Sequence, residues 1–194
     1  MQFEEILARR RSVRSYQSKP VPRSIITRLL RAANSAPSGA NASPWLYVVV
    51  EARLTKHAIR QASEEADRRW NATQSRAFKT WLASQRISYQ KPFLEEAPVL
   101  IVAFSDERSP YAVESTWLSL AFLILAATEA GLGTLTYTPG DPAFLTTLLG
   151  VPTYYRPQAI LPLGYPRDDE VSHARPKPAV RTSARLNHYQ TPYG

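Results

Sequence analysis

Apolar residues follow two different spacings along this chain, and segments of the two kinds alternate. One kind repeats every three or four residues, as on the buried face of a helix, and the other forms short continuous apolar runs that are typical of buried strands. Helices are expected at about 2–10, 22–36, 54–70, 118–130 and 142–149, and strands at 45–50, 99–104, 134–138 and 158–164. This order, with more helix than strand, predicts an α+β fold in which helices flank a mixed β-sheet.

Two segments lack the pattern of a self-contained core. Residues 67–91 interleave arginine and lysine with Trp70, Phe78 and Trp81, a spacing that suits a core or subunit contact and would also suit stacking on an aromatic substrate or a base. The chain after Pro166 is polar and rich in proline. We expect this tail to lie along another surface, such as that of a partner subunit.

The composition describes a globular protein of one domain. The chain has 194 residues, of which 44% are hydrophobic, and it has no cysteine, which excludes disulfides, thiolate metal sites and a cysteine nucleophile. Its net charge is +8. Such an excess of positive charge suits nucleic acid, an acidic surface or a small anionic ligand held in a pocket.

The sequence contains no recognisable export signal. Its first 14 residues are charged and lack an apolar run, and the uncharged apolar stretch 115–128 is shorter than the roughly 20 residues of a membrane helix. We therefore interpret that stretch as a buried core helix and expect the protein in the cytoplasm.

The basic loop Arg10-Arg-Ser-Val-Arg14 is the first candidate for chemistry. Guanidinium groups match phosphate oxygens in a two-pronged geometry, and Ser12 adds a hydroxyl donor. The loop would therefore suit a phosphate, although a solvated run of charges at a helix end would have the same composition.

Small residues form the second candidate, the loop Pro37–Asn41. Small side chains let backbone N–H groups approach a flat ligand, and the Asn41 amide could pair with the edge of a ring. Thr136 and Thr138 share one face of an expected strand and could line the same pocket. An ordinary turn and ordinary strand residues would look the same.

Other kinds of site are not indicated. The histidines at positions 57, 173 and 188 have no metal-ligand spacing, so they are expected at the surface and no metal site is predicted. The chain also lacks a P-loop and a Gly-x-Gly-x-x-Gly loop.

Four motifs in a fixed order resemble the FMN-dependent nitroreductase family over about residues 3–178. They are Arg10-Arg-Ser-Val-Arg14, Ala36-Pro-Ser-Gly-Ala-Asn41 followed by Pro44-Trp45, Gly131-Leu-Gly-Thr134 and Leu163-Gly-Tyr-Pro166. Within that family the chain is most similar to the iodotyrosine deiodinase branch, on the segments 36–40, 96–101 and 136–139.

This resemblance implies a single FMN-binding domain over residues 1–194 that works as an intertwined homodimer with two FMN sites between its subunits. It further implies a lid at about 64–92 over the active site and an extended tail at about 167–194 that embraces the partner. An FMN phosphate carries about two negative charges, which the basic loop would balance.

The resemblance also implies the FMN contacts. The basic loop would hold the phosphate and the pyrimidine edge, the small-residue loop would lie against the flavin, and the Thr138 hydroxyl would approach flavin N5 as the catalytic contact. The expected cofactor residues are Arg10, Arg11, Ser12, Arg14, Pro37, Ser38, Gly39, Asn41, Thr136, Tyr137 and Thr138, with Arg175 or Lys177 of the tail at the phosphate.

The lid departs from the deiodinase pattern, in which Glu, Tyr and Lys clamp an amino-acid substrate. Lys91 matches the lysine, but Trp70 replaces the tyrosine and Ala66 the glutamate. Glu65 is one residue away, a shift that turns a side chain about 100° around a helix. The expected substrate contacts are Ala40, Glu65, Trp70 and Lys91.

This departure favours reduction of nitroaromatics, quinones or related small aromatics by ping-pong hydride transfer, with NADH or NADPH as the electron donor. Reductive dehalogenation of a halogenated phenol or tyrosine stays open, because Glu64 or Glu65 could return to register. A basic, non-enzymatic protein that binds flavin or nucleic acid is the alternative of another class, although no nucleic acid or membrane partner is expected.

Overall fold

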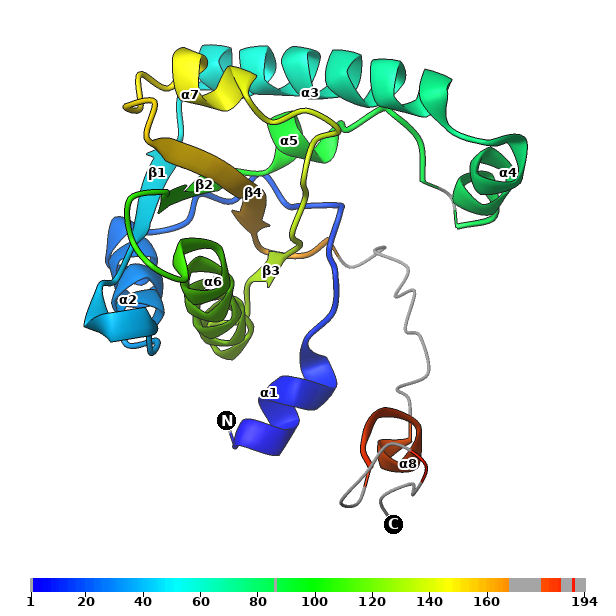
Figure 1. Cartoon of the computed structure of the whole chain (residues 1–194). Helices are drawn as coiled ribbons and strands as arrows, with labels where there is room; N and C mark the ends of the chain where they lie inside the picture. The colour runs from blue at the N-terminus through cyan, green and yellow to red at the C-terminus, as the bar shows by residue number, and fades with distance from the viewer. Residues whose placement is uncertain (1, 86, 168–178, 186–189, 191–194) are drawn as a thin grey trace.

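The computed structural model, which describes residues 2–85, 87–167, 179–185 and 190, contains a four-stranded sheet with helices on both faces (Figure 1). The strands are β1 (Trp45–Val50), β2 (Val99–Asp106), β3 (Gly133–Thr134) and β4 (Tyr155–Gly164). The helices are α1 (Phe3–Arg9), α2 (Arg23–Asn34), α3 (Arg53–Thr73), α4 (Arg76–Ser84), α5 (Phe93–Glu96), α6 (Ala112–Glu129), α7 (Phe144–Leu148) and α8 (Val180–Ser183), with a 3-10 turn η1 (Gly39–Asn41). The predicted α+β fold is confirmed.

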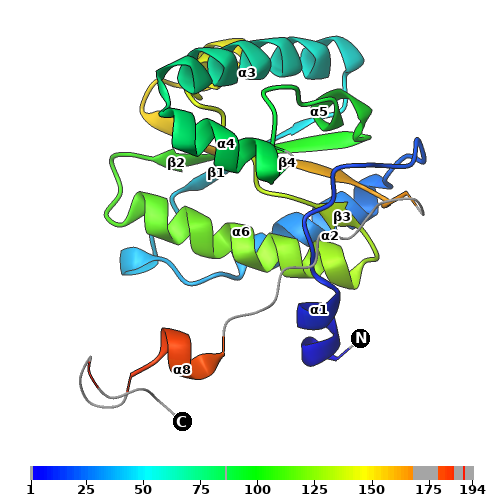
Figure 2. The same cartoon turned by 90° about the vertical axis from the view of Figure 1, so that its right-hand side faces the viewer.

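The position of strand β2 at the centre of the sheet explains why its residues 99–104 are all apolar. Leu100, Val102 and Phe104 pack into a core under α3, α5 and α7. Val99 and Ile101 pack into a second core under α2 and α6. Figure 2 shows these two helical layers above and below the sheet. Because successive side chains of a strand point to opposite faces, a strand covered on both faces has no polar position to alternate with.

The expectation of a mixed sheet needs a correction. The strands follow the order β1-β2-β4-β3 and every pairing between them is antiparallel, while a single parallel bridge joins Ser12 to Thr134. The end of β1 lies beside the start of β2, with Val50 opposite Leu100, because α3, α4 and α5 return the chain to the edge that it left. Hydrophobic spacing carries no information about strand direction, so the sequence did not reveal it.

Strand β3 is shorter than the predicted strand 134–138, and Pro162 gives the reason. Tyr137 and Ile160 exchange two hydrogen bonds, of 2.9 and 2.8 Å, in an isolated bridge. The next hydrogen-bonding pair of an antiparallel ladder lies two residues away, where Leu135 meets Pro162. Proline has no N–H to donate, so the ladder breaks between Thr134 and Tyr137. The bulge of the sheet lies elsewhere: Ala103 pairs with Ala159 and Phe104 with Pro157, which leaves Gln158 of β4 as the extra residue.

Helix α6 is longer than the predicted helix 118–130. Its first turn contains Glu114, and a carboxylate is favourable there because it faces the positive end of the helix dipole. By length and composition α6 could cross a membrane, but 39% of it is buried inside the protein, and a core helix passes the same test. Its buried side covers the sheet, whereas its outward half carries large apolar side chains. These are Val113, Trp117, Leu118 and Phe122, each 38–47% exposed.

Helix α4 lies in the segment that the sequence left without an assigned element. The Ser75 hydroxyl accepts a hydrogen bond of 3.2 Å from the Phe78 N–H and so caps the helix. The Phe78 ring packs edge-on against Trp70 of α3 and stacks on Trp81, with ring centroids 5.7 and 5.4 Å apart. The Trp70–Phe78 contact and a hydrogen bond of 3.2 Å from Lys79 Nζ to the Ala72 carbonyl therefore link α4 to α3.

We predict that Leu120→Ala lowers the free energy of unfolding by about 2–5 kcal/mol, because it opens a cavity between α6 and the sheet. Leu120 is fully buried. Leu54→Ala makes the same chemical change at a side chain that is 85% exposed, and it should cost no more than about 0.5 kcal/mol. Urea denaturation of both variants measures the difference. Equal losses would contradict the assigned core.

Candidate functional site

The basic loop is fixed beside β3 by its backbone. Val13 is buried, and its N–H donates a hydrogen bond of 3.1 Å to the Thr134 carbonyl. The Tyr16 hydroxyl donates to the Val13 carbonyl at 2.6 Å. A Cβ atom on Gly133 would lie 2.7 Å from the Val13 side chain, so the close approach requires glycine there. The structure thus holds the loop in one place relative to β3.

The predicted phosphate ligands divide between two sides of this loop. Ser12 and Arg14 are exposed, whereas Arg11 and Val13 line a hollow of about 480 Å³ with the last turn of α6. Because side chains of an extended segment alternate, Arg10 shares the side of Ser12 and Arg14. Arg10, Ser12 and Arg14 therefore form the set that is best placed to hold one phosphate.

The segment after β3 lies next to this loop. Ser12 and Thr134 form a parallel bridge, so the two segments run side by side in the same direction (Figure 1). Beyond the bridge Tyr137 is buried, while Thr136 and Thr138 are exposed, as the expected alternation requires. The structure therefore brings the basic loop and the two threonines together.

The small-residue loop lies at the opposite end of α6. The Gly39 N–H donates to the Ser115 hydroxyl at 3.1 Å, and a Cβ on Gly39 would lie 2.5 Å from the Tyr111 ring. Ala40 and Asn41 have φ angles of 51° and 55°, in the left-handed region that few non-glycine residues adopt. This loop is thus built tightly against the start of α6.

One chain consequently separates the predicted cofactor residues into two groups. The loop 37–41 contacts the first turn of α6, whereas the basic loop lies beside β3, which follows the last turn. The 18 residues of α6 span about 27 Å at 1.5 Å per residue. Figure 2 shows the light-blue turn η1 and the blue basic loop at opposite ends of α6. Arg175 and Lys177 lie outside the described residues.

A buried ion pair lies inside the predicted lid, and its carboxylate also connects the lid to the body of the protein through Gly140. Lys91 Nζ lies 2.8 Å from Asp67 Oδ2, and the two side chains are only 7% and 12% exposed. The other oxygen of Asp67 accepts a hydrogen bond of 2.8 Å from the Gly140 N–H, and Lys91 Nζ also donates to the Ser88 carbonyl. One carboxylate therefore links α3, the residues before α5 and the turn after Thr138.

Glu64 reinforces this connection. Its carboxylate accepts hydrogen bonds of 2.8 Å from the Lys91 backbone N–H and from Arg60 Nε. Burial alone would raise the pKa of Glu64, but the bonds from Arg60 and from the Lys91 backbone outweigh burial and lower it. Glu64 is therefore a charged structural group at neutral pH.

Tyr137 packs against the Asp67–Lys91 pair. Its ring centroid lies 5.4 Å from Lys91 Nζ. Burial, and then the negative charge of Asp67, raise the pKa of Tyr137 above its ordinary value, so its hydroxyl stays protonated. The buried hydroxyls of Tyr137 and Ser63 have no hydrogen-bond partner among the described residues.

The structure shows the surroundings of the predicted substrate contacts. Lys91 is buried against Asp67. Glu65 points to the other side of α3 and pairs with Arg68 at 2.6 Å, where both side chains are about half exposed. Trp70 remains 39% exposed, and Ala40 is exposed on the turn at the far end of α6.

Asp67 is the residue that the sequence analysis missed. It lies on the buried face of α3, four residues after Ser63 and eight after Ile59. That spacing was readable in the sequence as part of a helix face. Its charge concealed it, because an acidic residue next to two arginines resembles a solvated surface.

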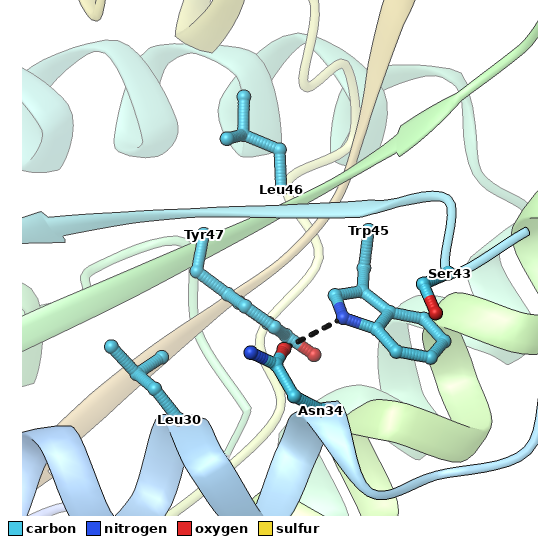
Figure 3. Close-up of a pocket in the computed structure, with 6 residues that line it drawn as sticks. All are labelled: Leu30, Asn34, Ser43, Trp45, Leu46 and Tyr47. Atoms are coloured by element: carbon cyan, nitrogen blue, oxygen red, sulfur yellow. Dashed lines mark hydrogen bonds between the residues drawn. The ribbon is translucent and has the colours of Figure 1, made fainter.

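A separate hollow follows the edge strand β1 (Figure 3). It has a volume of about 500 Å³ and is lined by Leu30, Asn34, Ser43, Trp45, Leu46 and Tyr47. Trp45 Nε1 donates to the Asn34 side chain at 2.9 Å, and the Tyr47 hydroxyl lies 2.6 Å from Ser119 Oγ. Burial raises the pKa of Tyr47 to about 12. The lining has no charged side chain and none of the predicted site residues.

The sequence is similar to a known protein family and to curated members of it. A model of the nitroreductase family matches residues 7–165. An iodotyrosine deiodinase of Thermotoga neapolitana is 37% identical over 177 residues, which cover 91% of this chain and 95% of that protein. An iodotyrosine deiodinase of Haliscomenobacter hydrossis is 34% identical over 180 residues, which cover 86% and 80%.

Two solved structures have a fold similar to that of this chain. An oxidised iodotyrosine deiodinase bound to FMN and 3-iodo-L-tyrosine superposes with a TM-score of 0.88 at 35% identity, covering 97% of this chain and all of that one. An FMN-dependent nitroreductase of Clostridium difficile superposes with a TM-score of 0.74 at 22% identity, covering 95% and 98%. The second likeness concerns the fold alone.

We predict that Asp67→Ala lowers the free energy of unfolding by about 3–5 kcal/mol, because it leaves the buried Lys91 charge without its partner. Glu65→Ala on the same helix breaks an exposed pair and should cost at most about 1 kcal/mol. Thermal and urea denaturation of the two variants provide the comparison. If Asp67→Ala is as mild as Glu65→Ala, the buried contacts of Asp67 with Lys91 and Gly140 do not stabilise this region.

Proposed function

Because the chain belongs to the nitroreductase family, we propose that it is an FMN-dependent oxidoreductase that removes a halogen reductively from a halogenated phenol or tyrosine. The likeness to iodotyrosine deiodinases, at 35–37% identity over almost the whole chain, supports this activity. It supports dehalogenation better than the nitroaromatic or quinone reduction that the sequence alone favoured. Those reductions remain to be compared in the same assay.

The observation that carries this proposal is the parallel bridge between Ser12 and Thr134. It places basic side chains, which suit a phosphate, beside the exposed hydroxyls of Thr136 and Thr138. A ligand with an anionic group at one end and a polar ring at the other matches this pair of segments, and FMN is such a ligand. In this proposal Arg10, Ser12 and Arg14 hold the phosphate, and Thr138 donates a hydrogen bond near flavin N5.

The proposal includes a homodimer, because one chain places the predicted cofactor residues of the loop 37–41 at one end of α6, a helix about 27 Å long, and the basic loop at the other end. The outward half of α6 presents an apolar surface made of Val113, Trp117, Leu118 and Phe122. One group of predicted cofactor residues lies at each end of this helix. If α6 of a second copy packed there in the opposite direction, the small-residue loop of one chain would meet the basic loop of the other. Each site would then contain residues of both chains.

Bound FMN would supply the electrons, and NADH or NADPH would reduce it between cycles. In the net reaction a carbon–halogen bond is replaced by a carbon–hydrogen bond, which consumes two electrons and one proton and releases a halide ion. The chain would bind and orient the aromatic ring, and the α3–α4 lid would exclude water. The cytoplasm, as a reducing compartment, is the proposed location.

The activity is tested by measuring halide. The purified protein should be yellow, and after anaerobic reduction with dithionite it should release iodide from an iodinated phenol or tyrosine. NADPH or NADH should bleach the same colour. A protein that binds no FMN would refute the cofactor, whereas an FMN protein that reduces nitroaromatics and releases no halide would restore nitroreduction as the function.

Arg14→Ala should weaken FMN binding by about tenfold to a hundredfold, because it removes one charge-assisted contact worth about 1.5–3 kcal/mol. Arg28→Ala removes the same charge from an exposed position on α2 and serves as the control. Fluorescence titration of the apoproteins with FMN measures both. Equal affinities for the two variants would remove Arg14 from the phosphate site.

A further inference from the structure

The charges of Asp67 and Lys91 in the lid are satisfied by partners inside the protein. Both oxygens of Asp67 are occupied, one by Lys91 Nζ at 2.8 Å and the other by the Gly140 N–H at 2.8 Å. Lys91 Nζ is shared between Asp67 and the Ser88 carbonyl, above the Tyr137 ring. The two charges thus pair with each other, and the pair is almost completely buried.

The remaining acidic residues of this helix are also engaged. Glu64 accepts from Arg60 and from the Lys91 backbone, and Glu65 pairs with Arg68 on the outer side. A ligand that carries an ammonium and a carboxylate, as 3-iodo-L-tyrosine does, loses its hydration on binding and needs counter-charges in return. Among the described residues of α3 and of the segment before α5, no lid carboxylate is left for that ammonium.

The lid surface near Thr138 is aromatic rather than charged. A Cβ on Gly140, two residues after Thr138, would lie 2.6 Å from Trp70 Cβ, so the backbone of this turn packs directly on Trp70. Trp70 is 39% exposed and is braced edge-on by Phe78, 5.7 Å away. The lid therefore offers a flat apolar face next to the exposed threonines.

We propose that this site takes halogenated phenols without a charged side chain, and that the Asp67–Lys91 pair discriminates against halogenated amino acids. This inference rests on the proposed function and specifies its substrate class. The phenol ring stacks against Trp70, and a ligand carboxylate competes with Asp67 for Lys91 before it can bind. Asp67 is thus a specificity-determining residue that acts through Lys91.

Calorimetric titration of the oxidised holoenzyme tests the inference with two ligands that share an ortho-iodophenol ring. The dissociation constant of 2-iodophenol should be at least about tenfold lower than that of 3-iodo-L-tyrosine. Equal or tighter binding of 3-iodo-L-tyrosine overturns the inference, as does the absence of binding by both ligands up to millimolar concentration. This measurement needs no variant.

Asp67→Asn keeps the shape of the side chain but removes the charge that holds Lys91. It should tighten binding of 3-iodo-L-tyrosine, and of the carboxylate-only analogue 3-(4-hydroxy-3-iodophenyl)propionate, by at least about threefold. The affinity for 2-iodophenol should stay the same. Asp141→Asn makes the same acid-to-amide change at an exposed position next to Gly140 and should alter none of the three. If Asp67→Asn does not change the ratio, the pair is structural only.

Halide release from the dithionite-reduced wild type separates this inference from the proposed function. Preferential binding of 2-iodophenol without iodide release would refute dehalogenation and retain the ligand class. Iodide release with a higher kcat/KM for 3-iodo-L-tyrosine would retain dehalogenation and refute the ligand class.

Discussion

The structure depends on burying the central strands of the sheet on both faces. Strand β2 offers apolar side chains to two separate cores, so neither helical layer can be removed without exposing one of them. This constraint fixes α2 and α6 on one face and α3, α5 and α7 on the other. The candidate site is built at the edges of these layers, where β3 ends and where the basic loop runs parallel to it.

Much of this fold is readable from hydrophobic spacing. Strand β1 has the predicted bounds, and β2 and β4 are longer than predicted by two and three residues. Continuous apolar runs correctly indicated strands covered on both faces. Strand direction was not readable, because spacing describes which side chains are buried and not where the chain turns back. Helix α4 was missed because its contacts are aromatic pairs and a serine cap, which leave little periodic signal.

The sequence predicted the part of the candidate site around the basic loop and β3 better than it predicted the lid. The neighbourhood of Ser12 with Thr134 follows the family motifs, and the structure provides the backbone contact that joins them. The lid could not be read in the same way. Aligning single positions led to Glu65, whereas the helix turns Asp67 inward and Glu65 outward. Which carboxylate meets Lys91 is decided by packing against Gly140 and Tyr137, segments that are distant in sequence.

The proline in β4 has a consequence for motion. The segment between Thr134 and Tyr137 is anchored at both ends by backbone hydrogen bonds, but it skips the pair opposite Pro162. Only Leu135 and Thr136 lie between the two anchors, and Leu135 is buried in the core. Opening of this stretch therefore requires no ladder hydrogen bond to break but costs the burial of one side chain. Thr136 lies within the stretch and Thr138 one residue beyond its second anchor.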